Sequence, residues 1–253
     1  MTRRPLSIAI VCQDEEDRIR ECLESARFAD EIVVVDSGSR DRTLEIVREY
    51  TDKVHSRPWK GWRDQKSWAA KQCSHEWVLT LDADEVISQE LQREILEVLE
   101  KDEIPEQGFT LPRRTYYQGR WIRHSGWYPD LKLRLYLRQK AGFGGEDPHE
   151  VIEVPGAVGE LSGELYHYTY RDLRHHAAQL QRYAVTNAEA KYKNGHRFKL
   201  IDLVFRPPYA FAKSYLLDLG FMDGMPGLLI GVMTGYYTFL KYARLWELKR
   251  EGR

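Results

Sequence analysis

A regular alternation of strand-type and helix-type segments over the first hundred residues constrains the fold more than any other feature of this sequence. Apolar, β-branched runs such as Leu6–Cys12 predict buried strands, and stretches with apolar residues at helical spacing, such as Ser88–Lys101, predict helices. The predicted order is strand 6–12, helix 14–26, strand 31–35, helix 41–50, strand 54–55, helix 62–73, strand 77–81 and helix 88–101. This alternation predicts an α/β fold, a mostly parallel sheet with helices on both faces.

The pattern changes at about residue 105. The next residues predict strands at 109–113, 131–138 and 151–154, followed by a helix over 172–193. The stretch Pro207–Lys249 is predicted to be helical, with a break at Gly224–Gly227. We therefore expect three parts, residues 1–104, 105–175 and 176–253, of which the first two form one domain and the last is a helical extension.

Composition narrows the class of protein. Apolar residues make up 42% and charged residues 30% of the 253 residues, which is typical of a soluble globular protein. The net charge of -1 gives no overall field that would attract nucleic acid, so we expect none as a partner. The three cysteines lack metal-binding or disulfide spacing, and Leu6–Cys12 is too short for a signal peptide, so we expect a cytoplasmic protein.

Polar clusters follow the predicted strands at residues 12–16, 36–41 and 82–85. Ligands of such sheets bind at the carboxyl ends of the strands, so we expect the three clusters to line one crevice. Asp82 and Asp84 stand two positions apart and should point the same way. Two such carboxylates suit Mg²⁺ or Mn²⁺, which would also bind substrate phosphates. The alternative is a solvated acidic turn that caps the following helix.

Asp36 ends the second predicted strand and begins a Ser-Gly-Ser turn. A carboxylate at this position can accept a hydrogen bond from a ribose hydroxyl or from the edge of a base. It can equally be a turn aspartate that holds its own loop. The residues by themselves favour neither interpretation.

Three segments of the sequence together resemble the inverting family 2 glycosyltransferases of the GT-A fold, in their order and in their spacing. These segments are Ser7–Glu16, Ile32–Asp41 and Val78–Glu85. Later pieces resemble the lipopolysaccharide core β-1,4-glucosyltransferase branch of that family, namely His149-Glu150, His167-Tyr168 and Gly220–Gly224. The resemblance implies a GT-A, Rossmann-like sheet in which residues 1–104 bind a nucleotide sugar and residues 105–175 hold the acceptor and the catalytic base.

The resemblance also implies roles for single residues of the nucleotide-binding half. Asp36 would bind the nucleotide base, expected to be uracil of a UDP-sugar donor. Cys12 and Asp14 would line the nucleotide pocket. Lys66 lies where related enzymes carry basic residues that face the donor, and it would reach a phosphate, unless it is an ordinary surface lysine.

A metal site is implied in the same way. Asp82 would meet the diphosphate and, with Asp84, the metal. Many enzymes of this fold add a late histidine, for which His167 is the candidate; the alternative is a packed core histidine. The nearby His175 and His176 are expected to face solvent.

An inverting enzyme of this fold needs one carboxylate that takes the proton from the acceptor hydroxyl. The usual Glu-Asp motif is replaced here by Gly-Glu-Asp-Pro-His-Glu at residues 145–150. The branch likeness assigns the base to Glu150, whereas Asp147 stands closer to the usual motif. We favour Glu150 and keep Asp147 as the alternative.

Two further regions suggest the acceptor. Trp121, Trp127 and Tyr128 lie in an Arg-rich loop. The aromatic side chains could stack on sugars while the arginines bind phosphates, or the aromatic side chains could simply pack beneath the loop.

The C-terminal region is basic and partly apolar. Residues 191–253 hold 11 Lys and Arg against five Asp and Glu, and Pro226–Leu240 is apolar but too short to span a bilayer. We expect this region to lie in a membrane interface rather than to pack only on the domain.

Together these features predict an inverting, metal-dependent hexosyltransferase that moves a hexose, expected to be glucose, from a UDP-sugar to a saccharide acceptor such as a lipopolysaccharide core. It would act as a peripheral protein on the cytoplasmic face of the inner membrane. The alternatives are transfer to a peptide or another lipid-linked acceptor, and a non-catalytic membrane protein that only binds sugar nucleotides.

Overall fold

The chain forms two compact units. The computed structural model describes residues 3–146 and 149–251. The sheet unit comprises the residues up to Arg113 together with Asp130–His167. The helical unit comprises Arg114–Pro129 and the residues from Tyr168 onward. Each unit is described by itself below.

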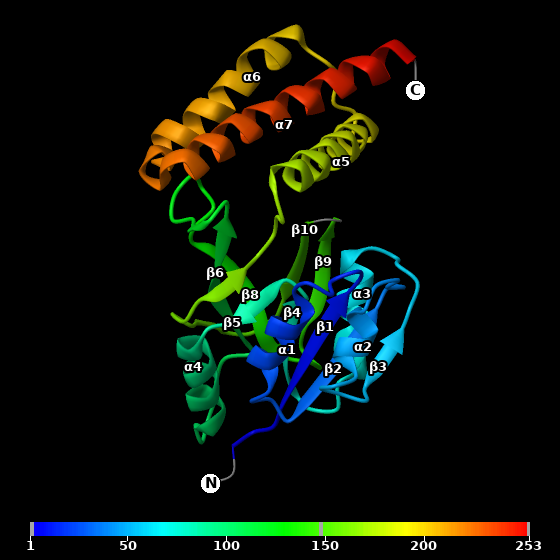
Figure 1. The fold of residues 1–253 in the computed structure, drawn as a ribbon, viewed down its shortest axis with the longest axis vertical. Helices are drawn as coiled ribbons and strands as arrows, with labels where there is room; N and C mark the ends of the chain where they lie inside the picture. The colour runs from blue at the N-terminus through cyan, green and yellow to red at the C-terminus, as the bar shows by residue number, and fades with distance from the viewer. Residues whose placement is uncertain (1–2, 147–148, 252–253) are drawn as a thin grey trace. The chain divides into compact units, whose positions relative to one another are not determined.

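The sheet unit begins with alternating strands and helices and continues with strands alone (Figure 1). Its elements are β1 (Leu6–Cys12), α1 (Ile19–Ala26), β2 (Glu31–Asp36), α2 (Thr43–Val47), β3 (Val54–Ser56), α3 (Trp62–Gln72), β4 (Trp77–Asp82), β5 (Glu85–Ile87), α4 (Gln89–Glu100), β6 (Gly108–Tyr117), β8 (Asp130–Leu137), β9 (Gly142–Glu146), β10 (His149–Glu153), β11 (Val158–Glu160) and β12 (Leu165–His167). The end of β6 runs into the helical unit.

The main sheet has the strand order β3-β2-β1-β4-β8-β6-β12-β5. Strands β3, β2, β1 and β4 are parallel, whereas β8 is antiparallel to both β4 and β6. The parallel half is the part that the alternating pattern predicted, and the antiparallel half begins where that pattern ends. The expected α/β class is confirmed, with antiparallel pairs of β8 beyond the four parallel strands and a short parallel pair of β11 with β6.

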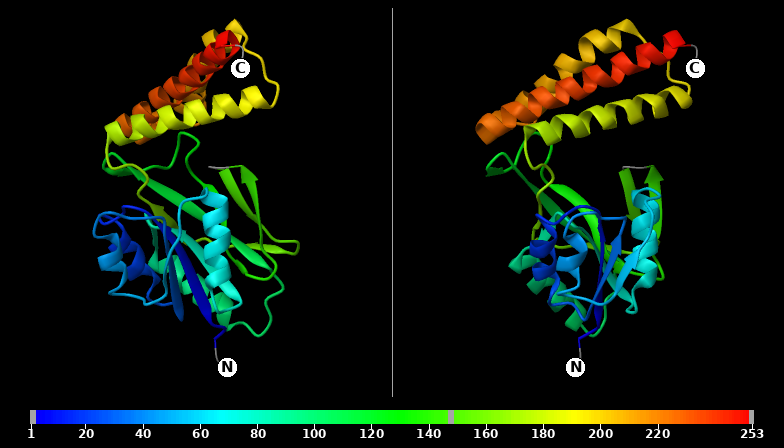
Figure 2. Two further views of the ribbon diagram at one scale, coloured as in Figure 1. Left: turned by 90° about the vertical axis from the view of Figure 1, so that its right-hand side faces the viewer. Right: turned by 45° about the vertical axis from the view of Figure 1, so that its right-hand side comes forward.

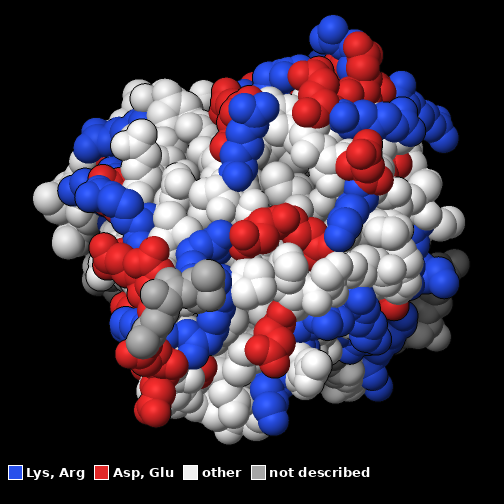
Figure 3. Space-filling model, turned by 90° about the horizontal axis from the view of Figure 1, so that it is seen from below, with Lys and Arg blue, Asp and Glu red and all other residues white. Residues whose placement is uncertain are grey.

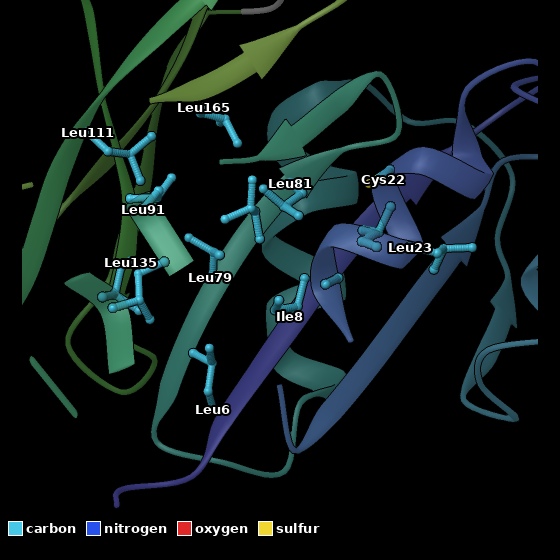
Figure 4. Close-up of a cluster of buried hydrophobic side chains, with 14 of the residues drawn as sticks. Leu6, Ile8, Cys22, Leu23, Leu79, Leu81, Leu91, Leu111, Leu135 and Leu165 are labelled. Atoms are coloured by element: carbon cyan, nitrogen blue, oxygen red, sulfur yellow. The ribbon is translucent and has the colours of Figure 1, made fainter. Parts of the chain in front are cut away.

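The central strand β1 shows why helices cover both faces. Leu6, Ile8 and Ile10 belong to one buried cluster, which also contains side chains of α1, α2 and α4 (Figure 4). The alternate residues Ala9 and Val11 belong to a second cluster with side chains of α3. Successive residues of a strand point to opposite faces, so an unbroken apolar strand needs cover on both sides.

Charged side chains of both signs are interspersed over the face shown in Figure 3. The exposed ion pairs of the protein include Arg20 with Glu49 and Arg93 with Glu90. Pairs of this kind contribute little to stability, because water screens both partners. This mixed surface fits the net charge of -1.

The helical unit contains β7 (Arg120–Trp121), which pairs with the end of β6, and three long helices (Figure 2). The helices are α5 (Leu173–Lys193), α6 (Leu200–Ala212) and α7 (Gly224–Glu251), with a π-helical turn at Lys213–Leu217 and a 3-10 turn at Gly220–Asp223. Helix α7 packs against both α5 and α6.

The predicted helix break at Gly224–Gly227 is wrong. The chain reverses earlier, around Leu219 with φ 55°, and α7 begins at Gly224 and continues through Pro226. Proline is tolerated in the first turn of a helix, because the N–H that it lacks has no partner there. The Gly/Pro cluster therefore starts a helix instead of interrupting one.

Helices α6 and α7 approach closely through a row of glycines. Gly227, Gly231 and Gly235 are four residues apart on α7. A Cβ atom at Gly231 would stand 3.1 Å from the Cβ of Tyr215, and one at Gly235 would stand 3.2 Å from the carbonyl oxygen of Pro207. The glycines let the two backbones pack together with little side-chain volume between them.

We predict that Gly227→Ala destabilises the helical unit. The added methyl group would lie 1.8 Å from the carbonyl oxygen of Gly220. Overpacking of this kind costs about 1–3 kcal/mol, more than the ~1 kcal/mol that alanine gains in helix propensity. Thermal unfolding followed by circular dichroism should show a lower midpoint for this variant. Gly235→Ala, whose methyl would meet a 3.2 Å contact instead of one at 1.8 Å, should lose less stability, and equal losses in both variants would contradict the packing argument.

Candidate active site

A pocket of about 500 Å³ opens at the carboxyl ends of β1, β2 and β3. It is lined by Gln13, Asp14, Ser37, Gly38, Arg40, Ser56, Arg57 and Pro58. The first two polar clusters of the sequence meet here, since the Asp14 backbone N–H donates to Ser39 Oγ (2.9 Å) and the Arg40 N–H donates to Asp14 Oδ1 (2.7 Å). The pocket is polar and carries two arginines, so it suits an anionic ligand.

Asp36 holds the loop that forms one wall of this pocket. Its carboxylate is buried and accepts hydrogen bonds from the backbone N–H groups of Gly38 (2.9 Å) and Ser39 (3.1 Å), and from Ser39 Oγ. The structure thus gives Asp36 the geometry of a turn aspartate. A ligand in the pocket would meet Ser37 and Gly38 rather than a fully exposed carboxylate.

Cys12 lies beneath the pocket, in the hydrophobic core. Its thiol is 3.9 Å from Asp36. Burial first, and then the negative charge of Asp36, raise the pKa of the Cys12 thiol far above its usual range. Cys12 therefore stays neutral and forms part of the floor under the loop, where a thiolate would repel the carboxylate.

Lys66 is the central cation of the site. It comes from α3, its side chain is only 2% exposed, and the interpretation as an ordinary surface lysine is wrong. Its ammonium lies 2.7 Å from Asp82 Oδ1 and 2.5 Å from Glu150 Oε1. One buried charge therefore links the end of β4 with β10, two segments that are far apart in the sequence.

The second oxygen of Asp82 is held by another buried cation. Arg134, on β8, lies 2.8 Å from Asp82 Oδ2 and 2.7 Å from Glu85 Oε1. Burial alone would raise the pKa of Asp82, but the charges of Lys66 and Arg134 outweigh it and hold that pKa well below its usual range. Asp82 is thus a carboxylate at neutral pH.

Asp84 lies in the turn after β4 and faces a different partner. Strand β12 pairs with β5 and sets His167 opposite Glu85, which brings His167 Nε2 to 3.4 Å from Asp84 Oδ2. Burial raises the pKa of Asp84, and the neighbouring His167 more than offsets this, so the pKa lies below its usual value. The structure brings these two predicted metal ligands together.

The donor set fits a metal ion only in part. Among residues 3–146 and 149–251 there is no cluster of three or more His, Cys, Asp or Glu side chains that could hold an ion. Lys66 and Arg134 engage both oxygens of Asp82, so Asp84 and His167 are the better-suited pair. Mg²⁺ commonly takes one or two carboxylates and completes its shell with water and substrate phosphates.

Sequence reasoning missed three residues that hold the carboxylates in place. Glu85 is fully buried and accepts from the Asp82 backbone N–H (2.9 Å), and it also pairs with Arg134 and Arg113. The sequence does contain a signal for this network, because Arg134 interrupts an apolar strand between Leu133 and Leu135. A buried arginine in such a strand needs a carboxylate partner nearby.

The remaining predicted residues fall in several places. Asp147 lies outside the described residues. Trp127 packs against Tyr117 and Tyr170 inside the helical unit.

The expectation that His176 faces solvent is wrong. His176 is buried, stacks on Tyr170, and forms a hydrogen bond with the Tyr117 hydroxyl through Nδ1 (2.8 Å). Burial lowers the pKa of His176 to about 4, which keeps it neutral.

Comparisons with known proteins agree with this architecture. The model of the family described as Glycosyl transferase family 2 matches residues 7–152. The chain is 31% identical over 251 residues to the lipopolysaccharide core biosynthesis glycosyltransferase LpsC of Rhizobium meliloti, covering 96% of this chain and 92% of that protein. It is 28% identical over 262 residues to an uncharacterized glycosyltransferase of Rickettsia typhi, covering 99% and 89%.

A solved structure supports the fold. The mannosyltransferase PcManGT of Pyrobaculum calidifontis, in complex with GDP-Man and Mn²⁺, matches with a TM-score of 0.57 at 14% identity, over 98% of this chain and 88% of that one. The GT-A fold and the family resemblance read from the three sequence segments are thereby confirmed.

We predict that Lys66→Met lowers the free energy of unfolding by about 3–5 kcal/mol, because it leaves buried carboxylates without their shared cation. The lowered pKa of Asp82 stabilises the fold at neutral pH, and that stability is lost as the pH falls toward it. Without Lys66 the pKa of Asp82 moves back toward its value in the unfolded chain, so the stability lost below about pH 4 should be smaller than in the unaltered protein. Urea unfolding at pH 7 measures the first effect, and its dependence on pH between 2 and 6 measures the second. Arg93→Met, at an exposed ion pair, should change little, and an equal effect there would refute the role of Lys66.

Proposed function

The chain belongs to glycosyl transferase family 2, and we propose that it moves a hexose, with glucose as the expected sugar, from a UDP-sugar to a saccharide acceptor with inversion. The activity as a glycosyltransferase follows from the family. The name of the relative LpsC supports a lipopolysaccharide core as the acceptor. The sugar, the stereochemical course and the use of a metal are the proposed parts.

One observation carries the proposed chemistry: a single buried ammonium, that of Lys66, contacts both Asp82 and Glu150. Asp82 stands at the carboxyl end of a parallel strand, where ligands of such sheets bind. Lys66 therefore links Glu150 to Asp82, beside which the donor diphosphate is expected to bind. The side chain of Glu150 is 14% exposed, so an incoming hydroxyl can reach it.

The reaction can be written in terms of these groups. Glu150 takes the proton of the acceptor hydroxyl as that oxygen forms a bond to the anomeric carbon. The bond from this carbon to the diphosphate breaks on the opposite side, and its electron pair leaves with UDP. Attack opposite to the leaving group inverts the anomeric centre.

Binding of the donor uses the pocket at the ends of β1, β2 and β3. The nucleotide would lie against Ser37 and Gly38, a wall that Asp36 holds in place, and against Asp14 on the other side. Lys66 would offer its charge to a phosphate. Asp84 and His167 would hold a Mg²⁺ or Mn²⁺ ion, which neutralises charge on the departing diphosphate. The GDP-Man and Mn²⁺ complex of the structural relative supports such a ligand class.

The proposal includes a place of action, the cytoplasmic face of the inner membrane. The basic residues of the C-terminal region support attraction to an anionic membrane surface. The alternatives remain transfer to a peptide or another lipid-linked acceptor, and a non-catalytic protein that binds UDP-sugars. A non-catalytic protein would bind UDP but release none from UDP-sugar when the acceptor is present.

We predict that Asp84→Asn abolishes metal-dependent binding of the donor. Mn²⁺ with UDP should raise the melting temperature of the unaltered protein more than UDP alone, because a ligand of the folded state stabilises it in proportion to the logarithm of its concentration over Kd. In the Asp84→Asn protein the Mn²⁺ increment should vanish while the fold survives. Asp30→Asn, a carboxylate far along the chain at an exposed pair, is the control. Full turnover of the Asp84 variant in metal-free buffer would contradict the proposal that Asp84 holds a metal ion needed for transfer.

We predict that Glu150→Gln lowers kcat for transfer by about 10²–10⁴, because the hydroxyl loses its general base. The affinity for UDP should change little. Glu153→Gln, an exposed carboxylate on the same strand, serves as the matched control and should keep its activity. Asp147→Asn tests the alternative. A large loss there, with Glu150→Gln active, would assign the base to Asp147.

A further inference from the structure

The helical unit exposes an unusual amount of apolar side chain. Most of the exposed large apolar side chains among the described residues lie between Leu200 and Trp246. None of the 13 residues of α6 is buried, although the helix includes Leu200, Ile201, Val204 and Phe205. A surface of this kind on one unit indicates a partner that is itself apolar.

The exposure is densest where α6 turns into α7. We call residues 216–225 the hairpin tip. Its six exposed apolar side chains are between 45% and 68% accessible; they are Leu216, Leu217, Leu219, Phe221, Met222 and Met225.

The two acidic residues of the hairpin tip are both neutralised within the unit. Asp218 pairs with Lys213 at 2.7 Å. Asp223 is 1% exposed and accepts from the backbone N–H groups of Arg123 (3.1 Å) and His124 (2.8 Å). Arg120, half exposed, donates to the carbonyl of Met222 at 3.2 Å. The tip therefore presents apolar groups with a cation beside them.

The packing behind the tip points to the same partner. Helix α7 meets α6 at Gly231 and Gly235, and four residues earlier Gly227 meets Gly220 of the 3-10 turn. Small residues at this spacing let helices associate by close packing where the surrounding medium supplies no hydrophobic drive, as in lipid. An apolar outer surface and a glycine-lined inner interface together match a hairpin in contact with lipid.

The length of the hairpin limits how deep it goes. No single helix among the described residues is long and apolar enough to cross a membrane, whereas Leu200–Leu217 with Gly220–Glu251 has the required composition across a bend. The shorter arm is helical from Leu200 to Leu217, about 27 Å, which is still short of the apolar layer of about 30 Å. A hairpin that inserts only its tip would stay within one leaflet.

We propose that the α6–α7 hairpin docks this protein on an anionic phospholipid bilayer by inserting its tip, residues 216–225, into one leaflet. The neighbouring Arg120 and Arg123 then lie at the level of the phosphate groups. Asp223 bonds the loop that carries them directly to the inserted tip. This consequence for the acceptor rests on the proposed function: the substrate is a glycolipid, whose phosphates and sugars the loop meets at the membrane surface.

The first test places a fluorescent probe at the tip. The native Cys12, Cys22 and Cys73 are buried, so an exposed cysteine introduced as Leu217→Cys labels selectively with an NBD maleimide. Vesicles of phosphatidylcholine with 30% phosphatidylglycerol should raise the NBD emission severalfold and shift it to the blue. The same label at Val185→Cys, an exposed site on α5, should show little change. Equal responses at both sites, or none at Leu217, would overturn the insertion.

The second test measures affinity by vesicle sedimentation. Leu217→Gln/Met225→Gln should weaken binding to the anionic vesicles at least tenfold, while Leu173→Gln/Val185→Gln, which changes two exposed apolar residues of α5, should bind as the unaltered protein does. Vesicles of phosphatidylcholine alone should bind more weakly than the anionic ones. Unchanged binding of the tip variant, or a dimer that buries the tip in light scattering, would refute the proposal.

The outcome can be separated from that of the proposed function. Transfer to a detergent-solubilised glycolipid should survive in the tip variant, because its substitutions leave Lys66, Glu150 and the donor pocket untouched. Tip-dependent vesicle binding without any transfer would refute the proposed function and leave the docking. Transfer without tip-dependent binding would refute the docking alone.

Discussion

The buried ammonium of Lys66 is the interaction on which the geometry of the site depends. It has almost no contact with water and is balanced by carboxylates from β4 and β10. A buried charge is tolerated only when it is paired, and breaking such a pair leaves an uncompensated ion. Helix α3 is therefore fixed to both strands, and the strands are fixed to each other through it.

This arrangement couples two parts of the proposed reaction. Asp82 is next to the expected diphosphate and Glu150 is the expected base, and they share one cation. Arg134 and Glu85 extend the network, so that positive and negative groups alternate within it.

The sequence predicted the parts of the molecule that depend on local patterns. β1 was predicted to the residue, and the parallel half followed from its alternating strands and helices. The partners of Lys66 were out of reach, because an ion pair over 84 positions leaves no periodic trace. The expectation that His176 faces solvent was wrong for a similar reason. The residues that bury it, Tyr117 and Tyr170, come together around it only in the folded chain.

The C-terminal region shows how an apolar stretch can mislead when it is taken as one surface. Pro226–Leu240 was expected to meet the membrane; within it, Gly231 and Gly235 face α6. Close backbone packing removes that side from any external partner and leaves the apolar residues of α6 and of the tip outside. The apolar surface that stays exposed therefore comes from both helices: it includes α6 and the tip, and also Val232, Tyr236 and Phe239 of α7.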